Sequence, residues 1–125
     1  MKIAELEKLS KDRLSDAKAL HKAGCYDGAF YICGYAIELG LKKKICVTLG
    51  WDEYPSDGKY KFLKTHDFEV LLHFSGVEKH VKKMFISEWS IVMKWNPETR
   101  YFLKPQTAEG TKLMIESVEA IWRNL

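Results

Sequence analysis

Apolar residues recur every three or four positions along most of the chain, which is the spacing of one face of an α-helix. In the segment Ile3–Lys22 the apolar stripe faces a charged opposite side, and Gly24 follows as a residue that readily closes a helix. A last amphipathic helix is expected after Thr107, a residue that suits the N-cap position. Because no segment alternates apolar and polar residues as a half-buried strand does, the pattern predicts an all-α fold.

The second predicted helix, Tyr26–Leu49, is apolar nearly all round, with a main stripe that includes Ile37 and Leu41. A second apolar set lies on its other side and comprises Tyr31, Tyr35, Leu39 and Cys46. A helix of this kind is buried on several sides or shared with another subunit. Tyr31, Tyr35 and Leu39 are therefore candidates for a dimer interface, with the last helices as the alternative. Gly34 and Gly40 weaken a helix and are expected where another helix approaches closely.

The rest of the chain predicts a long connection, a short helix and a further long helix. Residues 51–64 form the connection, and the short helix begins after Thr65 as N-cap and ends at Gly76. Residues 77–95 form the long helix, which Asn96-Pro97 breaks. The large side chains interpreted as core are Met84, Trp89, Trp95 and Trp122. Together the elements predict one domain, residues 1–125, built as an antiparallel up-and-down bundle of four long helices plus one short helix.

Composition limits the class of protein without naming a function. The chain has 125 residues, of which 46% are hydrophobic and 30% charged, and its formal net charge is +3. These values exclude a disordered, collagenous or disulfide-scaffold protein, and the uncharged stretches are far shorter than the ~20 residues of a membrane-spanning helix. The three cysteines lack C-x-x-C spacing, and the charged N-terminus is unlike a secretory signal. We expect a cytoplasmic protein with reduced thiols and no membrane contact.

Several short strings, in order along nearly the whole chain, resemble HEPN domains. They are RLSDA at 13–17, AGCYDGA at 23–29, GYAIELGLK at 34–42, KTHDF at 64–68, the leucine pair at 71–72, Trp95, and the Arg-Tyr pair at 100–101. The resemblance implies an antiparallel helical bundle that usually dimerises. It also implies one of two activities: metal-independent RNA cleavage in prokaryotic toxin–antitoxin and defence systems, or non-catalytic binding of nucleotides or RNA, often beside a small nucleotidyltransferase.

The catalytic HEPN members carry an arginine, four to six further residues, and then a histidine. Guanidinium charge there stabilises the phosphate transition state, and imidazole transfers a proton during attack by the 2′-hydroxyl. After Arg100 the permitted positions hold Pro105, Gln106 and Thr107, and His21 lies one position too far from Arg13. Since the spacing is absent, we expect no family-type cleavage, although a rearranged site stays open.

Six residues are candidates for ligand binding: Glu38, Lys42, Lys64, His66, Arg100 and Tyr101. Glu38 is either a polar member of a cleft or a buried carboxylate paired with Arg13 or Arg100, and the buried pair is favoured because buried charges are normally paired. His66 contacts a phosphate or base, or transfers a proton, or it simply belongs to the start of the short helix; the last reading is favoured. Arg100, in a loop, is equally an anion contact or a surface ion pair.

A lysine-rich segment surrounds the long connection. Residues 42–64 hold six lysines against three acidic residues, interleaved with Trp51, Tyr54, Tyr60 and Phe62. Such a segment either holds single-stranded nucleic acid by charge and stacking or is a solvated loop whose aromatic rings pack on the bundle, and the second reading is favoured. No histidine pair has i,i+4 spacing, so we expect neither a metal site nor a cofactor.

Three functions follow. The first is a non-catalytic, homodimeric HEPN-like module that binds a nucleotide, RNA or a partner nucleotidyltransferase. The second is a ribonuclease with a rearranged site, for example Arg100 with His66. The third is a purely structural interaction protein.

Overall fold

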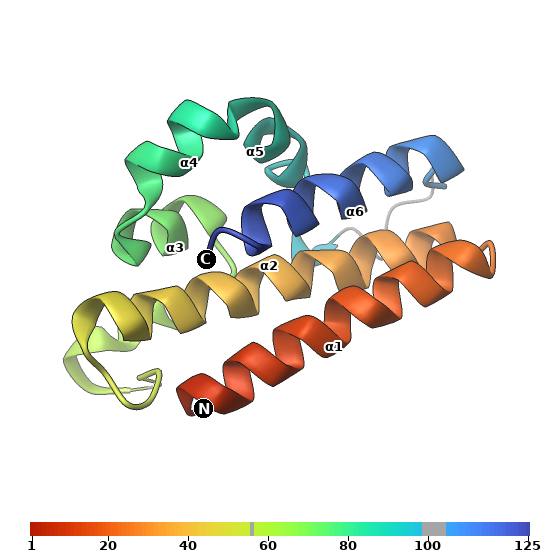
Figure 1. Cartoon of the computed structure of the whole chain (residues 1–125). Helices are drawn as coiled ribbons and strands as arrows, with labels where there is room; N and C mark the ends of the chain where they lie inside the picture. Colours follow the sequence, from red (N-terminus) through yellow and green to blue (C-terminus); the bar gives the residue numbers. More distant parts are fainter. Residues whose placement is uncertain (56, 99–104) are drawn as a thin grey trace.

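The computed structural model describes residues 1–55, 57–98 and 105–125, and within these ranges the chain is helical and has no β-strand. The expected all-α class is therefore confirmed. Helices α1 (Ile3–Lys22) and α2 (Tyr26–Leu49) have the predicted bounds and form an antiparallel hairpin (Figure 1). Gly24, in the short link between them, has φ of 81°, a left-handed conformation that glycine adopts without steric cost.

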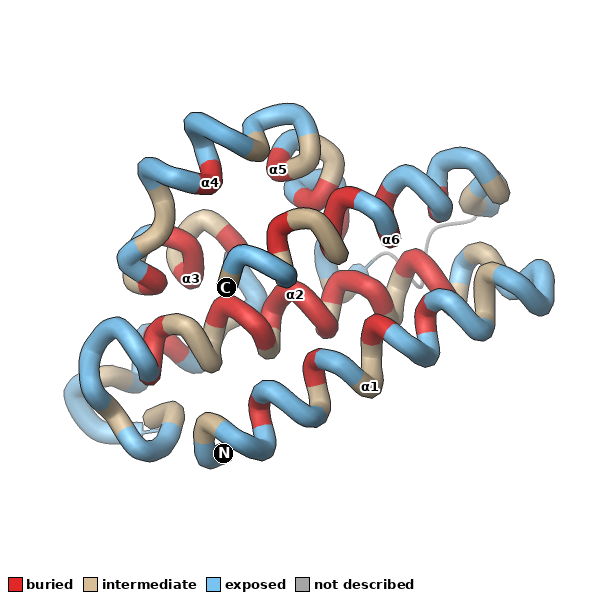
Figure 2. The backbone as a smooth tube through the Cα atoms, in the orientation of Figure 1, coloured by how far each residue is buried: buried red, intermediate tan, exposed pale blue. Residues whose placement is uncertain are grey.

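Helix α2 lies at the centre of the fold. It contacts α1 on one side, and α3 (Phe68–Ser75) and α6 (Ala108–Trp122) on others. Figure 2 shows buried positions along nearly its whole length, whereas α1 is exposed on its outer side. Of the two alternatives that the sequence left for this helix, burial on several sides within the chain is confirmed.

The prediction of one long helix over residues 77–95 is wrong. The segment forms two short helices, α4 (Glu78–Met84) and α5 (Ile86–Val92). They meet at Phe85, whose φ of −132° and ψ of 34° are not helical. The break redirects the chain, so that Trp89 reaches the core while Met84 is 60% exposed. The expectation that Met84 is a core residue is therefore also wrong.

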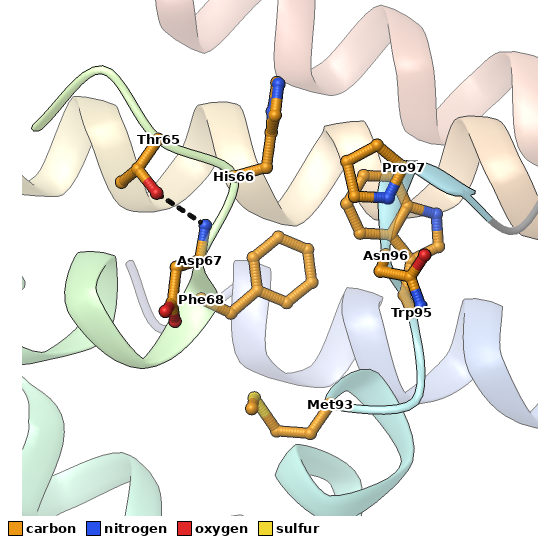
Figure 3. Close-up of a pocket in the computed structure, with 8 residues that line it drawn as sticks. All are labelled: Thr65, His66, Asp67, Phe68, Met93, Trp95, Asn96 and Pro97. Carbon is orange, nitrogen blue, oxygen red and sulfur yellow. Dashed lines mark hydrogen bonds between the residues drawn. The ribbon is translucent and has the colours of Figure 1, made fainter.

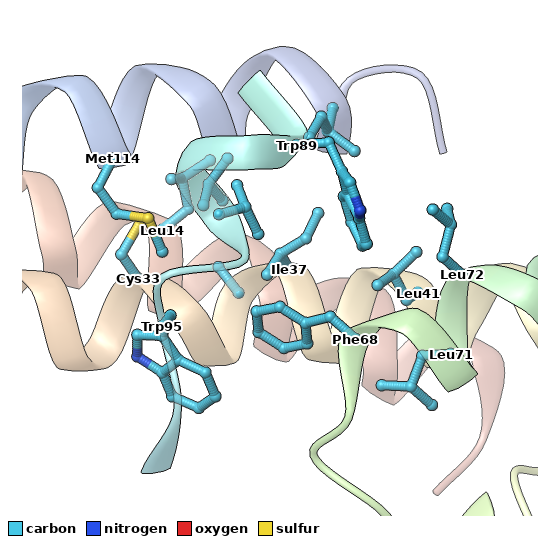
Figure 4. Close-up of a cluster of buried hydrophobic side chains, with 14 of the residues drawn as sticks. Leu14, Cys33, Ile37, Leu41, Phe68, Leu71, Leu72, Trp89, Trp95 and Met114 are labelled. Carbon is cyan, nitrogen blue, oxygen red and sulfur yellow. The ribbon is translucent and has the colours of Figure 1, made fainter. Parts of the chain in front are cut away.

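The core fills the space between α2 and the layer formed by α3, α5 and α6. Figure 4 shows side chains from these elements, from α1 and from the segment after α5 converging there, among them Leu14, Cys33, Ile37, Leu41, Phe68, Leu71, Leu72, Trp89, Trp95 and Met114. Burial of this apolar surface is the main stabilising contribution to the fold. Among the described residues, no helix combines the length and apolar character needed to cross a membrane.

The two interior glycines of α2, Gly34 and Gly40, lie where other parts of the chain come close, and the predicted approach of another helix is confirmed at Gly40. A Cβ at Gly40 would come within 2.9 Å of Trp122 on α6. At Gly34 the neighbour is Trp95, which follows α5 rather than belonging to a helix. Close approach therefore explains why α2 contains residues that weaken an isolated helix.

The long connection contains the 3₁₀ helix η1 (Gly58–Leu63), and Leu63 is buried. The hydroxyl of Tyr54 donates a hydrogen bond to the carbonyl of Leu63. This hydrogen bond joins the two ends of the connection to each other beside the C-terminal half of α2.

Candidate ligand site

Glu38 is a buried carboxylate with two partners, an ammonium group and an imidazole ring. It lies on α2 and is 3% exposed. The Nζ of Lys42, one helical turn further on, donates to its Oε2 at 3.1 Å, and the Nδ1 of His66 lies 2.6 Å from its Oε1. Because an unpaired buried charge is costly, these partners explain how α2 accommodates Glu38 inside the fold. The expected partner Arg13 is wrong, since its Nε lies 3.2 Å from Asp16 instead.

His66 is oriented by this contact. A carboxylate only accepts hydrogen bonds, so the Nδ1 of His66 carries the hydrogen that it shares with Glu38. In the neutral imidazole, Nε2 is then an acceptor, and the side chain is 54% exposed. One ring nitrogen is thus held by Glu38, and the other is left as an acceptor in the neutral ring.

The backbone around His66 is fixed by the start of α3. The N-cap is Asp67, whose carboxylate accepts the backbone N–H groups of Glu69 and Val70. The expectation that Thr65 is the N-cap is therefore wrong: its hydroxyl accepts the N–H of Asp67 at 3.0 Å. His66 thus lies between two residues whose side chains fix the local turn.

Trp95 brings a distant part of the chain to the same place. Its indole N–H donates to the carbonyl of Tyr31 at 3.0 Å, and its ring stacks on Phe68 with centroids 5.1 Å apart and planes 7° apart. Tyr35 meets Trp95 edge to face at 5.1 Å and His66 edge to face at 6.1 Å. These contacts connect α2, the start of α3 and the segment after α5 through a continuous set of rings.

A hollow of about 420 Å³ lies between the start of α3 and the segment after α5 (Figure 3). We call it the His66 hollow; its lining residues are Thr65, His66, Asp67, Phe68, Met93, Trp95, Asn96 and Pro97. Phe68 and Trp95 are almost fully buried, so they form its floor, while His66, Asp67 and Asn96 are exposed at its edges. The hollow therefore combines an apolar floor with polar groups that can donate and accept hydrogen bonds.

A smaller hollow of about 200 Å³ adjoins the other side of the Glu38 contacts. Lys42 and Lys64 both line it, together with Leu39 and Tyr54. The Nζ of Lys42 lies 5.3 Å from the centre of the Tyr54 ring, and burial raises the pKa of that phenol. Lys42 thus contacts the carboxylate of Glu38 and the ring of Tyr54. The exposed Lys64, by contrast, adds positive charge at the surface.

The structure brings together four of the six predicted ligand-binding residues: Glu38, Lys42, Lys64 and His66. Arg100 and Tyr101 lie outside the described residues. Tyr31 and Tyr35, two of the three dimer-interface candidates, are half-buried against Trp95 within the chain, and their hydroxyls lie 3.1 Å apart. The third candidate, Leu39, lines the smaller hollow.

Three lining residues of the His66 hollow were not singled out by the sequence: Met93, Asn96 and Pro97. The Asn-Pro pair indicated only the end of a helix. It reaches the hollow because Trp95 docks on Gly34 of α2, a contact between residues far apart in the chain. Within the part of the chain that the structure describes, no three His, Cys, Asp or Glu side chains are grouped to hold a metal ion.

Comparison of the chain with models of protein families, with curated proteins and with solved structures gives no match.

Proposed function

We propose that this protein is a HEPN-like, non-catalytic binding module and that the His66 hollow takes the base of a nucleotide or of RNA. One observation carries the proposal: an imidazole fixed by the buried carboxylate of Glu38 stands at the edge of an aromatic-floored hollow. Sites for small ligands are typically concave and apolar with a few oriented polar groups, as here.

The polar groups favour a base over a phosphate inside the hollow. Asp67 is acidic and would repel a phosphate, but the carboxylate oxygen that does not cap α3 can accept an N–H group of a base. The Nε2 of His66 adds an acceptor. A phosphate is better placed toward Lys64, outside the hollow.

Binding is favoured over cleavage because the arginine–histidine spacing of the catalytic HEPN members is absent from the sequence. The same resemblance supports a prokaryotic toxin–antitoxin or defence-type role with a nucleotidyltransferase as partner. A nucleotidyltransferase encoded next to the gene for this protein would support this partner. The absence of such a neighbouring gene would count against it.

The proposal includes an antiparallel up-and-down bundle in which α4 and α5 together replace the third long helix, and it includes a homodimer. Leu39 or the last helices supply the dimer contact more readily than Tyr31 and Tyr35, whose rings already pack on Trp95. Light scattering at micromolar concentration should give twice the mass of the chain. A monomer there would remove the dimer from the proposal.

A thermal-shift panel of nucleoside mono-, di- and triphosphates tests the proposed site. A ligand present at a hundred times its dissociation constant should stabilise the fold by ~2.7 kcal/mol. His66→Ala should reduce that shift, while His80→Ala, which changes an exposed histidine on α4, should leave it unchanged. A flat response to every nucleotide and to RNA would favour the purely structural function, and equal shifts in both variants would exclude the His66 hollow.

One contact favours ribonuclease activity as a second candidate. An imidazole held by a carboxylate is the arrangement of a general base, and the Nε2 of His66 could take the proton of a 2′-hydroxyl. Incubation with total RNA separates the two functions. Cleavage by the wild type that is lost in both His66→Ala and Arg100→Ala would establish the ribonuclease and displace the binding module.

A further inference from the structure

A third hollow, of about 360 Å³, lies at the C-terminal end of α2 and is separate from the Glu38 contacts. We call it the Phe62 hollow. Its lining residues are Leu49, Trp51, Tyr60, Phe62, Leu63 and Phe74. They come from three places in the chain: the end of α2, the helix η1, and α3. The fold thus gathers four aromatic rings that the sequence distributes over more than twenty positions.

These rings are arranged in two tilted pairs. The centroids of Trp51 and Tyr60 are 4.6 Å apart, and those of Phe62 and Phe74 are 5.3 Å apart. Phe62 is 53% exposed and Leu49 is 44% exposed, although both are large and apolar. Exposed apolar residues that are scattered need no explanation, but a contiguous and concave set indicates a binding surface.

A cation lies at the edge of this hollow. The Nζ of Lys59 is 5.3 Å from the centre of the Tyr60 ring. Lys59 directly precedes Tyr60 in η1, and it is exposed. By contrast, Lys42 and Lys43 of the same lysine-rich segment are paired with Glu38 and Glu7. Lys59 therefore supplies positive charge next to the aromatic rings.

We propose that the Phe62 hollow binds one unpaired base of single-stranded RNA and that Lys59 contacts the adjoining phosphate. Aromatic rings stack on any base, and a cation beside them attracts the backbone, which is how single strands are generally held. An acidic peptide would satisfy the charge of Lys59, but it would not require four aromatic rings. The exposed ring of Phe62 therefore favours a base as the occupant.

The Phe62 hollow is close in sequence to the His66 hollow, the proposed base site. Phe62 lines one hollow and His66 the other, and four residues span at most about 14 Å. A short single strand can cover such a distance. The inference thus extends the proposed function, because it makes single-stranded RNA the ligand and assigns it a second contact.

Fluorescence anisotropy with an end-labelled, unstructured RNA of about 12 nucleotides tests the proposal. Phe62→Ala should weaken binding at least about fivefold, the loss expected for one stacked base. Lys59→Ala should weaken binding and reduce the slope of log affinity against log salt by about 0.7, the value for one phosphate contact on a single strand. Since both residues are exposed, circular dichroism should show both variants folded.

Two control variants change similar side chains elsewhere. Met84→Ala removes an exposed apolar side chain from α4. Lys22→Ala removes a charge from the last residue of α1, which lies beside the start of α2 and so roughly 36 Å, the length of α2, from the Phe62 hollow. Both should bind RNA like the wild type. If Phe62→Ala also binds like the wild type, the Phe62 hollow takes no base and the proposal is overturned.

The outcomes separate this inference from the proposed function. If Phe62→Ala loses RNA affinity but keeps the thermal shift with a mononucleotide, both hollows act as proposed. Suppose that mononucleotides shift the thermal midpoint of the wild type, but that its affinity for the RNA is no higher than its affinity for a mononucleotide. The Phe62 hollow is then excluded as an RNA contact, and the His66 hollow stands. If Phe62→Ala weakens RNA binding while His66→Ala changes neither measurement, the Phe62 hollow stands alone.

Discussion

The indole of Trp95 lies directly on the backbone of Gly34, so close that a Cβ at position 34 would come within 2.0 Å of the ring. This contact determines where the chain goes after α5. It brings Asn96 and Pro97 to the side of the hollow that faces His66 (Figure 3). A glycine in the middle of α2 therefore shapes the site although it does not line the hollow.

Gly34→Ala should destabilise the protein by about 2 kcal/mol, because overpacking against a buried ring outweighs the ~1 kcal/mol that alanine adds to helix propensity. Gly28→Ala, in the same helix, is the matched control. Its Cβ would meet Leu20 at an ordinary 3.6 Å, so it should leave stability unchanged or raise it by up to about 1 kcal/mol. Urea unfolding followed by tryptophan fluorescence compares the two. A Gly34→Ala protein as stable as the wild type would contradict the close contact.

The first two helices could be predicted from sequence because, in long helical segments, the apolar pattern and the residues at the ends indicate where each helix begins and ends. α1 has one apolar stripe and a glycine just past its end, and α2 ends at Gly50 with φ of 70°. The two interior glycines of α2 indicated close approach, though not by which residue. Local periodicity and turn chemistry are sufficient for elements of this length.

The break at Phe85 could not be predicted, because it depends on what the segment packs against. Residues 77–95 have helical periodicity, but Trp89 and Met84 take opposite environments once α5 is redirected toward the core. The same holds for the site. His66 was a candidate, yet its contact with Glu38 joins residues 28 positions apart, and the sequence instead suggested Arg13 or Arg100 as the partner of Glu38.

The three thiols should differ sharply in reactivity. Burial raises the pKa of Cys33 to about 12, and it also raises the pKa of Cys46, so neither forms the reactive thiolate near neutral pH. Cys25 is exposed. A thiol reagent such as DTNB should therefore modify one cysteine rapidly in the native protein and all three in denaturant. Rapid modification of Cys33 without unfolding would show that the core around α2 opens far more readily than its packing indicates.

Acid should weaken the contact between α3 and the segment formed by α4 and α5. The indole N–H of Trp89 and then the ammonium of Lys82 hold the pKa of Glu69 below its ordinary value of 4.5. A depressed pKa means that the folded state binds this proton less readily than the unfolded chain. The stabilisation from Glu69 is therefore complete above about pH 4.5 and is lost as the pH falls through the lower, folded-state pKa.

Glu69→Gln should make the thermal midpoint less dependent on pH between about pH 6 and about pH 3 than it is in the wild type. Asp52→Asn, which changes an exposed carboxylate after α2, is the control and should keep the wild-type dependence. The same pH dependence in Glu69→Gln and in the wild type would mean that the contact with Trp89 does not hold in solution.

Glu38→Gln tests whether the buried carboxylate stabilises the fold through its contacts with Lys42 and His66. The change leaves the ammonium of Lys42, which is 15% exposed, without its anion. Removing one partner of a fully buried pair costs 3–5 kcal/mol, and because His66 and Lys42 keep some access to water we expect about 2–3 kcal/mol. Glu116→Gln, which changes an exposed ion pair with Lys112, should alter stability little.

A double variant separates charge from orientation at this site. Glu38→Gln with Lys42→Met removes both charges, so it should recover part of the stability that Glu38→Gln alone loses. The glutamine oxygen can still accept the Nδ1–H of His66, and the imidazole therefore keeps its orientation. The double variant should then retain most of the nucleotide-induced thermal shift that His66→Ala loses. If the double variant loses the shift as completely as His66→Ala does, the charge of Glu38 or Lys42, and not the orientation of His66, is what the ligand requires.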